Sequence, residues 1–483
     1  MRFLGLAFLA VAGGYAAGMQ SIPGLHVSLT PGTDTALTLL IAVVAVIPIG
    51  VRIAQHRFDL FEPIVPAAAA FLLLYVGRPL YEQAQYHHHI YVNVVVDGEW
   101  RLTLLVVLVS VFAFNLGYLL DFGELLSSRW QIRLPSQDVT IALAAILTVV
   151  AGAALLLRAY IAGGIHLLLT NRSAYHSGAN SATVTLAITL ALPAMLLLWS
   201  VSGRHRTAAR WLISLPLTVY LLLAIPGGNR RFVLVLAAAI VVFWYARHDR
   251  RPSVLRIVVV VCLLTLLVIN PARQIRTGQA SYAGAITSSV SHPLNAPGSL
   301  LAAQDTTAMD SLAMLLMDVG NGKPIPFMHG ADFVTETVLQ PFPHSIVPRP
   351  DGIRNADIKY RFGYGEGRCS SLCPTYPVMA SFWADFGFPS VAVGCFLLGV
   401  AARWWWGVFQ RNRHDVIAQA AYASTFFLWF YVWWDSLGSF FIQFLLLVLP
   451  LLVARWLGAR STRRAAPIRT PDRRRQHGLE AGP

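Results

Sequence analysis

Twelve stretches of this sequence are apolar over nearly the whole length that a helix needs to cross a lipid bilayer. Such a helix takes about 20 mostly hydrophobic residues. Charged residues make up only 12% of the chain, against about 25% in soluble domains, which excludes a soluble enzyme and a disordered chain. We therefore predict an all-α polytopic membrane protein with about twelve transmembrane helices. The windows are residues 2–18, 35–51, 63–80, 102–120, 139–157, 182–201, 211–226, 232–246, 255–270, 387–407, 415–433 and 437–457.

The positions of the basic residues predict the orientation of these helices. Most of the 37 lysines and arginines fall in segments on the same side of the membrane as the N-terminus. Such residues are enriched in cytoplasmic loops, so both termini are expected in the cytoplasm. The net charge of +14 then reflects topology, and we expect no nucleic acid as a partner. The first window could instead be a signal peptide, although the eleven spans that follow favour a retained helix.

This orientation divides the chain into four parts. We expect transmembrane helices 1–9 in residues 1–270, an extracytoplasmic loop in 271–386, helices 10–12 in 387–457, and a disordered basic cytoplasmic tail in 458–483. Within the loop, residues 298–318 have Leu and Met at helical spacing, which predicts an amphipathic helix that lies on the membrane or caps a cavity. Residues 332–339 predict a second, shorter one. Long loops are often lids over active sites; the alternative is a passive ectodomain.

Several arginines remain at the outer ends of predicted helices, where the charge bias of topology should remove them. Guanidinium groups form paired hydrogen bonds to phosphate oxygens, so these side chains are candidates for binding a pyrophosphate. The alternative is contact with lipid headgroups. Adjacent glycines 227 and 228 strengthen the binding interpretation for the pair that follows them. The candidates are Arg158, Arg172, Arg230, Arg231, Arg273 and Arg276.

The long loop also contains candidates for proton transfer. His344 lies between prolines, with Arg349 close after it, and an imidazole there suits a general base. Glu366 and Asp385 are acids that could serve as the base or neutralise the arginines. Cys369 and Cys373 could form a disulfide if they lie outside the cytoplasm.

A run of three histidines, residues 87–89, resembles a metal site at first sight. Consecutive residues of a strand point to alternate sides, and the valines that follow favour a small hairpin that turns at Asp97 and Gly98 instead. We therefore expect no metal site.

Four segments together give the chain a family resemblance. They are Arg57–Pro63 before the third span, Gly227–Phe232 between spans seven and eight, the loop with His344 and Arg349, and Ser381–Pro389 before a glycine-rich span. In this order they resemble the O-antigen polymerase family, the oligosaccharide repeat-unit polymerases of bacterial envelopes, which are related to O-antigen ligases.

The resemblance implies a fold similar to GT-C glycosyltransferases in the bacterial cytoplasmic membrane. Donor and acceptor would be oligosaccharides on polyprenyl diphosphate, with membrane lipids and a chain-length regulator protein as further partners. Arginines would stabilise the leaving pyrophosphate, since the sequence has no Asp-x-Asp pair, and no metal or other cofactor would be needed. The base would be His344, Glu366 or Asp385.

Three other functions compete with polymerisation. An O-antigen ligase transfers finished glycan with similar groups, and the sequence does not separate the two activities. A flippase or transporter of lipid-linked glycans is disfavoured, because substrate pathways through membranes usually contain charged residues in the middle of spans. A membrane acyltransferase is disfavoured because no histidine falls inside a predicted span.

Overall fold

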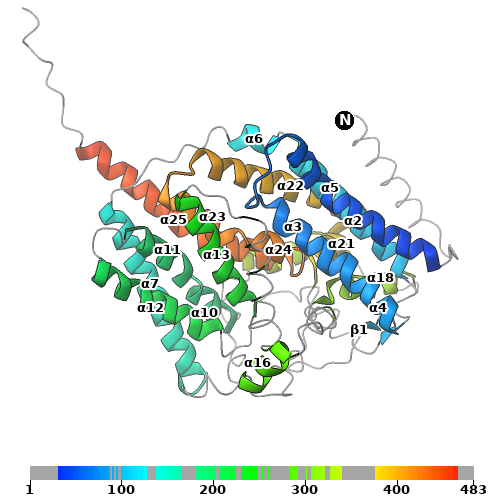
Figure 1. Ribbon diagram of the computed structural model, residues 1–483, viewed down its shortest axis with the longest axis horizontal. Coiled ribbons are helices and arrows are strands. Elements are labelled where there is room, and N and C mark those ends of the chain that lie inside the picture. Colours follow the sequence, from blue (N-terminus) through cyan, green and yellow to red (C-terminus); the bar gives the residue numbers. More distant parts are fainter. Residues whose placement is uncertain are drawn as a thin grey trace, which may run out of the picture.

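A computed structural model gives the fold, which is almost entirely helical (Figure 1). It describes residues 31–86, 90–91, 94–95, 99–120, 122–127, 137–165, 181–201, 206–224, 230–248, 282–291, 306–320, 327–339 and 376–465, with isolated residues between 253 and 271 and at 301 and 347. At some of these positions only the backbone is described. The predicted spans 2–18 and most of 255–270 lie outside the described residues.

Ten of the twelve predicted windows coincide with apolar helices. Five of these helices are long and apolar enough to cross a membrane, and five are shorter, which agrees with a polytopic membrane protein. The count of twelve stays a prediction. The long group comprises α2 (Pro31–Ala54), the continuous α3 (Ile64–Ala70), η1 (Phe71–Gly77) and α4 (Arg78–Tyr86), α5 (Trp100–Leu119), α7 (Gln137–Ile161) and α22 (Phe388–Arg411).

The shorter apolar helices include two that are interrupted within one predicted span. The described helices are α10 (Ser181–Ile188) with α11 (Ala191–Val201), α12 (Arg206–Ala224), α13 (Arg230–His248), α23 (Val416–Thr425) with α24 (Leu428–Tyr431), and α25 (Leu437–Ala465). The remaining elements are α6 (Phe122–Ser127), α16 (Tyr282–Ser291), α18 (Ala308–Gly320), α19 (Ala331–Phe333), η5 (Val334–Leu339), α21 (Val378–Phe386) and the strands β1 (Ile90–Tyr91) and β2 (Val94–Val95).

The structure corrects the predicted position of the hairpin turn, while the predicted division of the chain into four parts is not tested. The hairpin exists, but Tyr91 pairs with Val94, so it closes between these residues and does not turn at Asp97 and Gly98. Helix α25 continues to Ala465, past the end predicted at residue 457.

The predicted loop helix forms as α18, but it does not lie on the surface. Every residue from Thr306 to Leu316 is buried, and α18 packs against α5, η1 and β1. A helix buried on all sides belongs to the core. The loop therefore contributes a helix to the interior of the protein.

Helices α5 and α22 make the most extensive helix contact in the described fold, and glycines allow it. A Cβ atom on Gly117 would lie 2.1 Å from the carbonyl oxygen of Phe396, and one on Gly399 would lie 2.1 Å from that of Phe114. The two backbones therefore touch at these positions. Small residues permit this close packing between membrane helices.

The described loops identify two opposite ends of the bundle. At the end that we call the loop end, α18 lies beside the β1–β2 hairpin, and Asp34 of α2 forms an ion pair of 2.9 Å with Arg101 of α5. At the other, the turn end, lie α6 and the α22–α23 turn (Figure 1). This relative arrangement agrees with the predicted topology. The prediction that the loop end faces outward is not tested.

A network of charged and tyrosine side chains joins helices at the turn end. The Nε atom of Arg52 lies 3.4 Å from Glu62, and the Tyr118 hydroxyl donates a hydrogen bond of 2.5 Å to the same carboxylate. Arg403 forms an ion pair with Glu124, and the guanidinium groups of Arg52 and Arg403 each lie 5.8 Å from the Tyr118 ring centroid. Burial raises the pKa of Glu62, while Tyr118 and Arg52 act in the opposite direction. We call these five residues the turn-end network.

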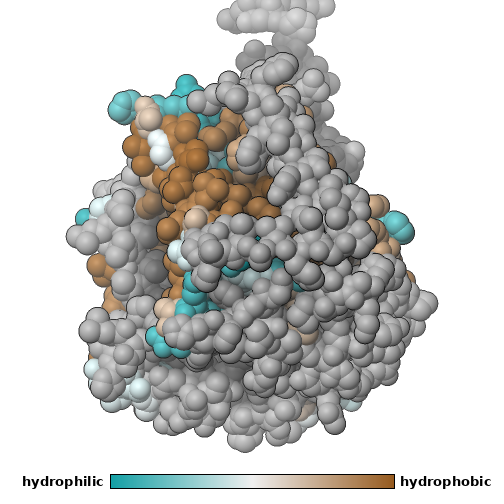
Figure 2. All heavy atoms as spheres, turned by 90° about the vertical axis from the view of Figure 1, so that its right-hand side faces the viewer, coloured by the Kyte–Doolittle hydropathy of each residue, from teal (hydrophilic) through white to brown (hydrophobic). Residues whose placement is uncertain are grey.

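One face of the bundle carries the expected membrane surface. Figure 2 shows hydrophobic surface with hydrophilic residues above and below it, on the side where α2 lies. Large apolar side chains of α2 are exposed there, including Leu39, Val43 and Ile53, which is 56% exposed. Apolar side chains without protein neighbours are normal where a helix contacts lipid.

Candidate functional site at the loop end

Arg78 lies where the π-helical segment η1 passes into α4. Its guanidinium forms an ion pair with Glu82, one turn further along α4, and its Nε atom lies 3.5 Å from Asp310 of α18. It also donates a hydrogen bond to the carbonyl oxygen of Leu301. All three charged side chains are at least 93% buried. We call Arg78, Glu82 and Asp310 the loop-end cluster.

This cluster fixes the long loop to the membrane-spanning helices. Buried charges are stable only when they are paired and hydrogen-bonded, so α18 and α4 are held in one arrangement. No role was predicted for Arg78 from the sequence. The spacing of Arg78 and Glu82, four residues apart on one helix, was the available signal. No feature of the sequence indicated that Arg78 would contact Asp310.

Asp385, a predicted base candidate, holds a turn of the loop. Its Oδ1 atom accepts a hydrogen bond of 3.0 Å from the Gly330 amide, and Oδ2 accepts one of 3.2 Å from the Phe333 amide. The backbone amide of His329 donates to the Asp385 carbonyl at 3.0 Å. The carboxylate is 4% exposed. These contacts favour a positioning role for Asp385, and its proposed role as a base is not tested.

The turn that Asp385 holds presents a histidine, His329, that was not predicted as a site residue from the sequence. His329 is exposed and has a φ of 49°, and Gly330 follows with a φ of 86°. Left-handed backbone at a residue other than glycine is uncommon and clusters at functional sites. The His329 ring lies 6.3 Å from Phe386, measured between centroids. Imidazoles are the commonest general bases, so His329 joins the candidates.

Asp435 is another buried acid, in the break between α24 and α25. It accepts a hydrogen bond from the Tyr431 hydroxyl and one of 2.9 Å from the Ser436 amide. The Tyr75 hydroxyl of η1 donates to the carbonyl oxygen of Trp433 in the same break. The amide of Val378, at the start of α21, donates to the Val432 carbonyl oxygen at 3.3 Å. The start of α21 and η1 are thus joined to this break.

Three of the predicted arginines lie at the loop end. Arg158 is in the last turn of α7 and is 1% exposed. Arg230 and Arg231 begin α13, as predicted, and the other end of α13 lies at the turn end, because Tyr245 packs 5.8 Å from Phe61. The side chains of Arg230 and Arg231 are not described.

The remaining predicted site residues lie outside the described part of the chain. Their roles stay predictions. They are Arg172, Arg273, Arg276, His344, Arg349 and Glu366. Within the described residues, no three His, Cys, Asp or Glu side chains are grouped so that they could hold a metal ion.

These features define a multi-pass membrane protein in which a helix of the long loop, α18, packs against spanning helices and is joined to them by a buried arginine and buried acids. The model of one protein family matches residues 25–461, and its description is O-antigen polysaccharide polymerase Wzy. The chain belongs to this family, which confirms the family expected from the sequence. No curated protein and no solved structure matches the chain.

Proposed function

We propose that this protein polymerises oligosaccharide repeat units carried on polyprenyl diphosphate, at the outer face of the bacterial cytoplasmic membrane. The observation that carries the proposal is the match to the Wzy polymerase family over residues 25–461. The arrangement at the loop end agrees with it, since Arg78, Arg158 and the start of α13 lie at this end, where Asp310 and Asp385 hold two parts of the loop. A GT-C-like fold and cytoplasmic termini are part of the proposal.

The proposed reaction is a single displacement with inversion at the anomeric carbon. A hydroxyl of the acceptor sugar attacks, a base takes its proton, and the polyprenyl diphosphate leaves with the electron pair of the broken bond. The leaving group gains negative charge in the transition state, which fixed cations stabilise. We assign this role, or glycan binding, to Arg158, Arg172, Arg230, Arg231, Arg273, Arg276 and Arg349.

Residues of the loop supply the proton acceptor in this proposal. His344 and Glu366 remain candidates from the sequence, and His329 is added because the structure exposes it beside the turn that Asp385 holds. Asp385 then acts as a positioning residue. An Asp385→Asn variant keeps an acceptor oxygen but loses one of two amide contacts, so activity should fall while the amount of protein in the membrane stays normal.

Arg230 and Arg231 allow the sharpest test of the arginine role. Each is replaced with Lys and with Ala in a strain without the native gene, and the polymer ladder and membrane protein level are measured. Loss of one charge-stabilising donor typically lowers the rate by about 10²–10³. Lysine keeps the charge but not the paired geometry, so at the position that binds it should not restore activity.

Arg247 provides a matched control, because it lies on the same helix at the turn end and donates a hydrogen bond of 2.6 Å to the Ser200 carbonyl oxygen. Arg247→Lys should leave the ladder unchanged. Full-length ladders from both lysine variants of Arg230 and Arg231, at normal expression, would contradict the proposed pyrophosphate site.

Two further measurements test the reaction class. Deletion of a polymerase leaves one repeat unit attached at the surface, deletion of a ligase leaves none, and deletion of a flippase traps units inside. Activity in washed membranes should also persist with a chelator. Activity that disappears with the chelator and returns with magnesium or manganese would contradict the metal-free mechanism.

A further inference from the structure

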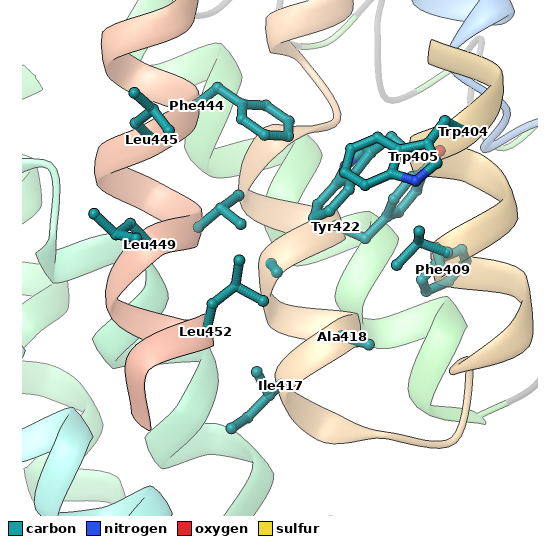
Figure 3. Close-up of a pocket in the computed structure, with 13 residues that line it drawn as sticks. Trp404, Trp405, Phe409, Ile417, Ala418, Tyr422, Phe444, Leu445, Leu449 and Leu452 are labelled. Carbon is teal, nitrogen blue, oxygen red and sulfur yellow. The ribbon is translucent and has the colours of Figure 1, made fainter. Parts of the chain in front are cut away.

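An apolar crevice of about 190 Å³ lies between α22, α23 and α25 (Figure 3). Trp404 and Trp405 lie at one end of it, and Ile417 and Leu452 lie at the other, toward the turn that joins α22 to α23. Along α25 it extends from Phe444 to Leu452, which corresponds to about 12 Å of helix.

Two of the lining residues use their polar groups in hydrogen bonds within the protein. The Tyr422 hydroxyl donates to the carbonyl oxygen of Phe61, and the indole N–H of Trp405 donates to Thr425 at 2.9 Å. Water needs several polar partners to occupy a cavity, and apolar cavities bind apolar molecules instead. The crevice is therefore suited to a hydrocarbon chain.

The crevice is bordered by side chains on the outer surface of the bundle. Leu445 is 47% exposed and Leu449 is 54% exposed, although both lie in the middle of an apolar helix. Exposed leucines at this depth of a membrane helix contact lipid. A lipid chain can thus reach the crevice from the bilayer.

Exposed positive charge lies near the end of the crevice that Ile417 and Leu452 line. Arg411 and Arg413 are exposed in the turn that separates Phe409 from Ile417, two residues that line the crevice. The nearest acid in the sequence, Asp415, is buried and accepts hydrogen bonds from the first amides of α23, at 2.7 and 3.0 Å. Glu124 is paired with Arg403, and its carbonyl oxygen accepts a bond of 3.2 Å from Arg411.

We propose that the crevice binds one acyl chain of an anionic phospholipid, whose phosphate lies against Arg411 and Arg413. The apolar lining accounts for the chain, and the exposed guanidinium groups account for the headgroup charge. This site is separate from the loop end, and the inference does not depend on the proposed polymerase activity.

The test uses the purified full-length protein and native mass spectrometry with phosphatidylglycerol. Ala421 lines the crevice and is 2% exposed, so Ala421→Phe should fill it and weaken lipid binding at least about tenfold. Arg411→Gln and Arg413→Gln should each weaken it about fivefold. Ala145 of α7 is exposed, and Ala145→Phe is the matched control that should bind as the wild type does.

Three outcomes would overturn the proposal. They are wild-type binding by Ala421→Phe, equal binding of phosphatidylglycerol and phosphatidylcholine, and preferential binding of a polyprenyl phosphate, which would identify a different occupant. If Ala421→Phe does not fold, a photoactivatable phosphatidylglycerol is added to the wild type. Cross-links within residues 444–452 or 404–409 support the site, and their absence contradicts it.

Discussion

Both ends of the bundle contain buried ionic groups, but the two sets join different parts of the chain. The turn-end network links spanning helices to their neighbouring short segments, and its Glu124 side chain is 44% exposed. The loop-end cluster links a spanning helix to α18, a helix of the long loop, and none of its side chains is more than 7% exposed. Helix α18 of the long loop is thus part of the folded core, which argues against a passive ectodomain.

The largest effect of a single substitution is expected at the loop end. Arg78→Met removes the cation that contacts Glu82 and Asp310, both buried carboxylates. Removing one partner from a buried ionic cluster typically destabilises a protein by about 3–5 kcal/mol. We expect a large decrease in the apparent melting temperature of the detergent-solubilised protein. An unchanged melting temperature would show that α18 is not held by this contact.

The next largest loss of stability from a single substitution is expected at the contact between α5 and α22. Gly117→Ala places a methyl group against the backbone of α22, which cannot rotate away, and overpacking of this kind costs about 1–3 kcal/mol. Gly152→Ala is the control, because a Cβ there has no neighbour within 4 Å and Ala favours helix by about 1 kcal/mol. The amount of folded protein, measured by fluorescence-detected size exclusion, should fall only for Gly117→Ala.

A smaller effect is expected for the corresponding arginine at the turn end. Arg403→Met leaves Glu124, which can be hydrated because it is 44% exposed. The loss of a partly exposed ion pair and of a ring contact amounts to about 1 kcal/mol. The melting temperature should therefore fall less than for Arg78→Met. Equal effects of the two substitutions would remove the distinction between the two ends.

Glu62 gives the smallest expected effect, which depends on pH. Because burial raises its pKa in the folded protein above the ordinary value of 4.5, folding favours the protonated form. The associated stability is present below pH 4.5 and is lost as pH rises through the folded-state pKa. Glu62→Gln should reduce this slope of melting temperature against pH at values above pH 4.5. Glu124→Gln should keep the wild-type pH dependence of the melting temperature. An identical slope in both variants would show that a group other than Glu62 causes this pH dependence.

Hydrophobicity was sufficient to predict most of the membrane helices, because lipid requires long apolar segments whatever their neighbours are. It could not predict the breaks within spans, such as the one at Thr189 and Leu190 or the π-helical segment η1. These depend on packing rather than on local sequence.

The candidate site shows the same limit. The start of α13 at Arg230 and the helix at α18 were predicted from local pattern. The pairing of Arg78 with Asp310 and the contact of Asp385 with the amide of Gly330 join residues that are far apart in the sequence. A single sequence contains no signal for such contacts, so the partnership of Arg78 with Asp310 and the turn at His329 were missed; only the spacing of Arg78 and Glu82 on one helix could have been noticed.

The glycine contact between α5 and α22 also has a consequence for biogenesis. Roughly 280 residues separate Gly117 from Gly399, so at about 5–20 residues per second the ribosome makes the second helix roughly 15–60 s after the first. During that interval the groove around Gly117 must be covered by lipid or by an insertion factor. Assembly of the bundle can be completed only after the last quarter of the chain has entered the membrane, so a truncated product would leave the face of α5 around Gly117 without α22 and open to degradation.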